Sequence, residues 1–88
     1  MDLVFVNKES GEKNIIGEDS LRESRRFDDV INGDIFKFLF DYNEANWVAV
    51  RNATHLYDNE VPEVLVKIKT INIQDNSLLV TGVGLYGV

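Results

Sequence analysis

The feature that most constrains the fold is a series of short apolar runs separated by polar turns. Runs at residues 3–6, 35–40, 64–68 and 78–80 are rich in valine, leucine, isoleucine and phenylalanine. Apolar runs of about four to eight residues bounded by turn residues are typical of β-strands. The polar stretches 7–13 and 74–77 lie between such runs, so each predicts a β-hairpin. The sequence therefore predicts a sheet of short strands.

The run at residues 35–40 places three phenylalanines on one face of a strand and Ile35, Lys37 and Leu39 on the other. Lys37 is the only polar residue among them, so we expect both faces to be buried. Residues 47–51 are predicted to form another strand. Further along, the apolar alternation changes phase between Ile68 and Ile71, which indicates a β-bulge near Lys69 and Thr70.

One helix is predicted, over about residues 20–31. Ser20 and Glu23 have the spacing of a capping box, and apolar residues then recur at roughly helical spacing. Asn32 and Gly33 follow, and helices commonly end in such residues. Ser24 and Asp28 interrupt the apolar stripe.

These elements together predict a single α+β domain over residues 1–88. We expect a mostly antiparallel sheet of five or six strands, or a small curled β-barrel of the size of SH3-like and OB-like barrels, with the one short helix. A fold of this size is compatible with many functions, so function has to be argued from particular residues.

The composition bounds where the protein acts and what it contacts. Fifteen acidic residues against nine basic ones give a formal net charge of −6, and there is no cysteine. No apolar run approaches the roughly 18 residues of a membrane span, and no signal peptide is evident, so we expect a cytoplasmic protein. A net negative charge opposes direct nucleic-acid binding and favours basic partners. The same charge could also serve solubility alone.

The last residues, TGVGLYGV, contain the glycine spacing of a dinucleotide-binding loop at Gly82, Gly84 and Gly87. That loop joins a strand to a helix whose N-terminus faces the pyrophosphate. Only Val88 follows the last glycine, so the structural context of the motif is missing. We therefore expect these glycines to be structural, allowing close backbone approach or a bulge, and no cofactor is predicted.

Metal-binding and catalytic patterns are also incomplete. Residues 41–46 begin like a calcium-binding loop, but Asn46 stands where glycine is needed and Asn52 where a bidentate glutamate is needed. His55 is the single histidine and lacks an evident nucleophile and orienting carboxylate. No metal site and no catalytic residue is predicted, and we expect a protein that is not an enzyme.

Two groups of residues are candidates for binding. Arg22, Arg25 and Arg26 would share one face of the predicted helix and could bind phosphate or an acidic partner. Alternatively, Arg22 pairs with Glu18 and Arg25 with Asp29. The second group adjoins the polar loops at both ends of the predicted strand 47–51, and its members are Tyr42, Trp47, Arg51 and Tyr57. Tryptophan, tyrosine and arginine dominate binding hot spots, which makes this group a candidate binding surface. Core packing is the alternative for Trp47.

Three functions remain open at this point. The leading hypothesis is a small acidic protein that recognises a basic macromolecule and inhibits it by covering a nucleic-acid-binding surface. The second is a small barrel that binds a nucleotide or another anionic ligand at a subunit interface, with the arginines as the anion site. The third is a structural subunit of a homo-oligomer. We expect a homo-oligomer joined through the uncharged strand at residues 78–86, near Leu79, Val83, Leu85 or Tyr86.

Overall fold

The structure, a computed structural model, describes residues 1–30 and 33–85, with the side chains of residues 1–22 and 34–85. This part of the chain forms one antiparallel sheet of seven strands in the order β2-β1-β5-β6-β7-β4-β3, one short α-helix and one turn of 3-10 helix. Their bounds are β1 Leu3–Val6, β2 Lys13–Ile16, η1 Glu18–Ser20, β3 Leu21–Val30, β4 Gly33–Asp41, α1 Glu44–Val50, β5 His55–Asp58, β6 Val61–Gln74 and β7 Ser77–Leu85.

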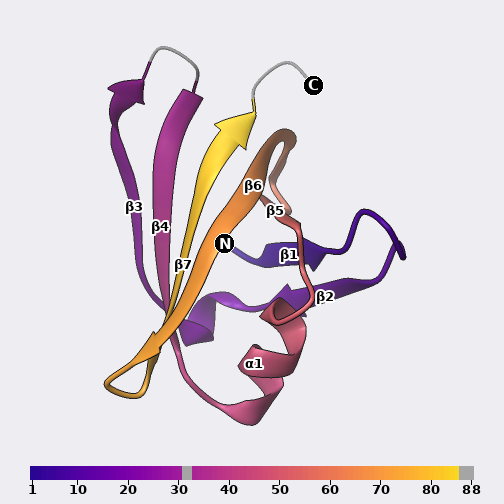
Figure 1. The fold of residues 1–88 in the computed structure, drawn as a ribbon, viewed down its shortest axis with the longest axis vertical. Helices are drawn as coiled ribbons and strands as arrows, with labels where there is room; N and C mark the ends of the chain where they lie inside the picture. Colours follow the sequence, from indigo (N-terminus) through magenta and orange to yellow (C-terminus); the bar gives the residue numbers. More distant parts are fainter. Residues whose placement is uncertain (31–32, 86–88) are drawn as a thin grey trace.

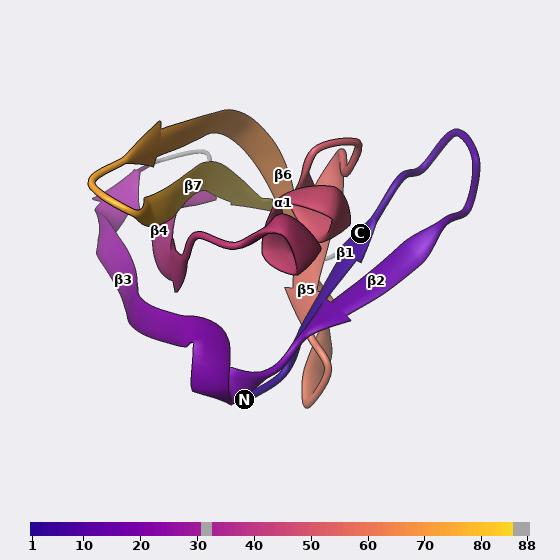
Figure 2. The same cartoon turned by 90° about the horizontal axis from the view of Figure 1, so that it is seen from below.

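The sheet curls without closing, and α1 lies across one end of it (Figures 1 and 2). β2 and β3 are the two edge strands, and η1 connects them along the chain. The predicted α+β class, with an antiparallel sheet and one short helix, is confirmed. The expected five or six strands fall short of the seven observed, and the sheet is not closed into a barrel.

Residues 21–30 form strand β3, so the helix predicted at 20–31 is wrong. β3 pairs antiparallel with β4, from Leu21 opposite Phe40 to Val30 opposite Gly33. The apolar stripe that suggested a helix was already interrupted by polar residues, and pairing with the phenylalanine-rich β4 prevails over local propensity. Asn32-Gly33, interpreted as a helix stop, is also the strongest short signal for a hairpin turn. Asn32 itself lies outside the described residues.

The helix lies instead at Glu44–Val50, where the sequence predicted a strand. Asn43 caps it, since its Oδ1 accepts a hydrogen bond of 2.8 Å from the Asn46 backbone N–H. Asn46 Nδ2 donates at 2.8 Å to the Asp41 carbonyl oxygen, which ties the first turn of the helix to the end of β4. The buried residues are Asn46, Ala49 and Val50, which are three and four apart. Both helical spacing and strand alternation fit this short apolar segment, and the cap decides between them.

The hydrophobic core fills the concave side of the sheet and the end covered by α1. Phe5 of β1 contacts Phe40 of β4 edge-to-face, with ring centroids 5.6 Å apart. Ala49 and Val50 of α1 belong to the same cluster. β4 is buried on only one face: Phe38 is 4% exposed, whereas Ile35 on the opposite face is 37% exposed. The expectation that both faces of residues 35–40 are buried is therefore wrong.

β7 lies inside the sheet, between β6 and β4, and its glycines allow neighbouring groups to come close. A Cβ on Gly82 would lie 2.6 Å from the Lys67 carbonyl oxygen. The structural role predicted for the glycines is thus confirmed at Gly82 and Gly84, while Gly87 and Tyr86 lie outside the described residues. The predicted bulge is also confirmed, since the β6–β7 register shifts between Ile68 and Thr70. A homo-oligomer joined through an open edge of residues 78–86 is contradicted for the described part, Ser77–Leu85, because both sides of β7 are occupied.

We expect Phe38→Ala to lower the free energy of unfolding by about 3–5 kcal/mol, because the ring is buried and its removal leaves a cavity. Ile35→Ala, on the exposed face of the same strand, should cost clearly less. Urea unfolding followed by tryptophan fluorescence measures both. Equal losses for the two variants would contradict the assignment of faces.

Gly82→Ala should destabilise the protein more than Gly84→Ala. The new methyl group at position 82 meets the backbone of β6, which cannot move without breaking the ladder, whereas at position 84 it lies 2.7 Å from the ring of Phe36, which can rotate. Thermal unfolding of the two variants, monitored by circular dichroism, compares them directly. A larger loss for Gly84→Ala would show that Phe36 is held more rigidly than β6.

Candidate functional site

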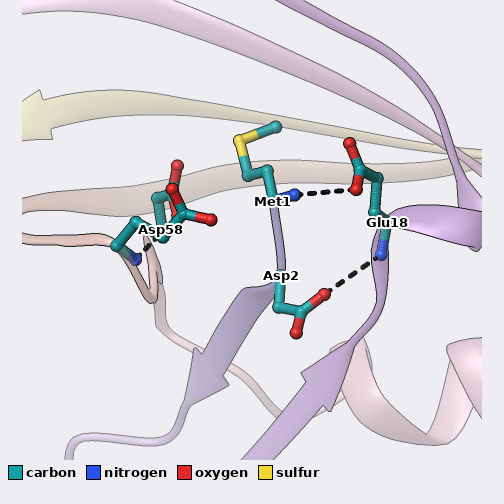
Figure 3. A network of polar contacts seen from close by, with 5 residues as sticks. Met1, Asp2, Glu18 and Asp58 are labelled. Atoms are coloured by element: carbon teal, nitrogen blue, oxygen red, sulfur yellow. Dashed lines mark hydrogen bonds and ion pairs between the residues drawn. The ribbon is translucent and has the colours of Figure 1, made fainter.

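A group of acidic side chains lies where β1 begins, β5 ends and η1 crosses between β2 and β3 (Figure 3). The antiparallel pairing of β1 with β5 sets Leu3 opposite Asp58. The Asn59 backbone N–H then donates at 3.0 Å to the Asp2 carbonyl oxygen, which holds the two chain segments together. We call the resulting surface the acidic corner, and its carboxylates are Asp2, Glu18, Asp58 and Glu60.

Backbone amides orient two of its members, and the N-terminal amine pairs with a third. Asp2 Oδ1 accepts from the Glu18 N–H at 3.3 Å, and Asp58 Oδ1 accepts from the Glu60 N–H at 2.9 Å. The Met1 amine forms an ion pair of 3.1 Å with Glu18 Oε2 (Figure 3). Glu18 nonetheless remains 73% exposed. Each of these carboxylates therefore keeps oxygens available to a partner.

The pKa of the N-terminal amine reflects the negative electrostatic potential at this corner. Its pKa is raised above 8.0, first by the hydrogen bond to Glu18, against the opposing effect of desolvation, and then by the charges of Glu18, Glu60 and Asp2. Among the described residues, no lysine or arginine side chain forms an ion pair with these carboxylates. The field around the amine is thus set by anions from three separate segments of the chain.

The arginines predicted as an anion site do not lie on a helical face. Arg22 sits in β3, where Nη1 donates to Ser77 Oγ at 2.6 Å and Nε lies 3.5 Å from Asp41 Oδ1. Arg25 and Arg26 are opposite Lys37 and Phe36 in the β3–β4 ladder, and their side chains lie outside the described part. The predicted partner of Arg22 is also different, because Glu18 pairs with Met1.

The predicted aromatic group lies on more than one element. Tyr42, 39% exposed, lies between β4 and α1, where its backbone N–H donates to the Asn76 carbonyl oxygen. Trp47 packs against the core from α1, as the alternative for this residue anticipated, and Arg51 is the exposed C-cap of the same helix. Tyr57 lies on β5 opposite Val4, which places it on the outer face of the sheet and half-buried. The four residues thus come from two parts of the fold, three from α1 and the segment before it and one from β5.

His55 lies on the outer face of the sheet in a cationic setting. Its Nδ1 is 2.7 Å from Thr54 Oγ1, which also accepts the Lys8 backbone N–H at 3.1 Å. Burial, and then the charges of Lys8 and Lys67, lower the pKa of His55 below 6.5. A histidine that activates a hydroxyl nucleophile is oriented by a carboxylate, which acts on its pKa in the opposite direction. Thr54 and His55 instead tie the β1–β2 turn to β5.

A small hollow opens between the β1–β2 hairpin and the end of α1, with Phe5 and Ala49 at its base and Asn7, Asn14 and Asn52 around it. It leaves about 160 Å³ of space between atoms, part of it open to solvent, and no part of the hollow is wide enough to hold a water molecule. An organic ligand therefore does not fit there without movement of the lining residues. Asn43 of the calcium-like loop serves as the helix cap, and no group of three or more potential metal ligands occurs among the described residues.

Comparison with protein-family models, with curated proteins and with solved structures gave no match to this chain. Within the described residues, no helix has the length and apolarity required to cross a lipid bilayer.

We expect the pKa of His55, followed through its ring proton by NMR, to lie below 6.5 and to rise in Lys67→Gln. The unfolded chain then binds the proton more tightly than the folded one, so the free energy of unfolding should be greatest above pH 6.5. It should fall as the pH is lowered through 6.5 toward the folded-state pKa, and level off below it. Lys69→Gln, two residues along β6, is the control and should leave the pKa unchanged.

Proposed function

We propose that this chain is a binding protein without catalytic activity, and that it recognises a basic macromolecular partner through the acidic corner. The observation that carries the proposal is that the charges of three carboxylates from separate segments, Asp2, Glu18 and Glu60, act on a single amine. Such a surface attracts lysine and arginine side chains and repels phosphate.

The corner is partly preorganised for this role. The amides of Glu18 and Glu60 already fix the carboxylates of Asp2 and Asp58, so less side-chain freedom is lost when a cation binds. An exposed ion pair contributes only about 0.2–1 kcal/mol, so affinity has to come from several carboxylates acting together. Binding of this kind accelerates association and weakens as salt is added.

A partner whose basic surface binds nucleic acid would be inhibited by such contact, because the carboxylates occupy the groups that otherwise hold phosphates. The net charge of −6 supports this mode of action. The alternative of an anionic ligand at an arginine cluster gains no support from Arg22, which contacts Ser77 and Asp41.

The proposal predicts that a deca-arginine peptide binds at the acidic corner. The triple variant Asp2→Asn, Glu18→Gln and Asp58→Asn should weaken binding about tenfold, since three exposed pairs contribute about 0.5 kcal/mol each. The amide side chains keep a carbonyl oxygen, so the backbone hydrogen bonds to Asp2 and Asp58 can persist. Calorimetric titration at low and physiological salt gives the affinities.

The matched control removes the same amount of charge elsewhere, through Glu9→Gln, Glu12→Gln and Asp75→Asn. Asp75 has a positive φ of 49°, which asparagine tolerates. Because it also removes three negative charges, this control weakens the long-range attraction of the peptide, and we expect it to lower the affinity by about twofold at most. Equal losses in the two triple variants would show that net charge, and not the corner, attracts the peptide.

A further inference from the structure

Strand β2 is an open edge of the sheet. Among the described residues it pairs with β1 only, and Figure 2 shows it at the outer rim of the curled sheet. Its four residues, Lys13 to Ile16, carry one charge, whereas six of the ten residues of the other edge strand, β3, are charged. Charged side chains are a common protection of sheet edges against pairing with another chain. β2 has little of this protection.

The ladder between β1 and β2 determines which backbone groups of β2 face outward. The Thr54 N–H donates at 2.9 Å to the Val6 carbonyl oxygen, so the backbone of Val6 faces β5. Val6 and Lys13 are therefore a non-hydrogen-bonded pair, and by the alternation of an antiparallel ladder Val4 and Ile15 are another. The N–H and C=O groups of Lys13 and Ile15 thus point away from β1, toward the open edge.

Ile15 is the most exposed large hydrophobic residue in the described part of the chain, at 64%. It lies beside Val4, which is 4% exposed, and Val4 lies beside Tyr57 on β5. These three residues form an apolar row across the outer face of the sheet, and the row stops abruptly at Ile15.

We propose that a second copy of this chain pairs with β2 along this edge, antiparallel, with Ile15 of each copy opposite Ile15 of the other. The two-fold register also sets Lys13 opposite Gly17, whose φ of −74° and ψ of 163° extend the strand conformation by one residue. Outward backbone groups then meet at the Ile15 pair, and the Gly17 N–H meets the Lys13 carbonyl oxygen, while the Gly17 carbonyl oxygen already accepts the Ser20 N–H at 3.1 Å. The apolar row continues across the axis, from Tyr57 and Val4 of one copy to those of the other.

Charge limits the length of this pairing beyond Lys13 and Gly17. The next position along would set Glu12 opposite Glu18, and both lie outside β2. The pairing therefore ends there. An interface this short is smaller than the roughly 1,200–2,000 Å² of a stable complex, so we expect a weak dimer, with Kd of about 0.1–1 mM.

Sedimentation equilibrium over about 10 μM to 2 mM tests the proposal, because the average mass should rise from 10.0 kDa toward twice that value. Ile15→Pro removes only an outward N–H, and proline is tolerated at that position of an edge strand. Ile15→Lys places a charge on the two-fold axis. Both variants should remain monomeric, whereas Val48→Lys, which replaces an exposed apolar residue on α1, should dimerise like the wild type.

A cross-link gives an independent result, since the chain contains no cysteine. Hydrogen-bonded antiparallel partners have Cα atoms about 5.5 Å apart, which suits a disulfide. Ile15→Cys should form a covalent dimer at least tenfold faster than Ile73→Cys, a comparably exposed position on β6. A wild-type mass that stays at 10.0 kDa up to 2 mM, or equal cross-linking of the two cysteine variants, would overturn the proposal.

Discussion

The pairing of β1 with both β2 and β5 is the contact on which the rest of the structure depends. All four residues of β1 are buried, and the strand joins the N-terminal hairpin to a segment some fifty residues away. It sets Asp2 beside Asn59 and thereby forms the acidic corner. At its other end it sets Val6 beside Thr54, which anchors the turn around Lys8. Displacing β1 by one residue would turn each of its side chains to the opposite face, and neither the acidic corner nor the contact between Thr54 and the turn around Lys8 would form.

Local features of the fold were predictable from the sequence, and nonlocal ones were not. The hairpins at residues 7–13 and 74–77 and the bulge between Ile68 and Thr70 follow from turn residues and alternation within a few positions. The predicted helix at 20–31 and the predicted strand at 47–51 were wrong, because a charged strand needs the phenylalanines of β4 to stabilise it and a short helix needs the Asn43 cap to define it. The Asn32-Gly33 pair was the available sign of a hairpin. The acidic corner combines residues that are distant in sequence, and only the β1–β5 register brings them together.

Charge is separated along β5, although the strand has only four residues. His55 at its start shares a row across the outer face with Lys13 and Lys67, and the pKa of His55 responds to cations. Asp58 at its end belongs to the acidic corner. A basic partner that approaches the corner is therefore repelled by the far end of the same strand. This arrangement restricts the orientations in which a partner can bind, which is the main contribution of electrostatic complementarity to specificity.

The proposed dimer and the proposed binding site are linked through Gly17 and Glu18. In the two-fold register, Glu18 of each copy lies beside the β2 seam, so the two acidic corners flank it on opposite sides. A partner with two basic sites could then contact both corners, and the second contact would form at a high effective concentration. Such a partner binds the dimer more tightly than the monomer and, by mass action, shifts the weak equilibrium toward the dimer. The short β2 edge therefore suits an assembly that is mostly monomeric alone and pairs when its partner is present.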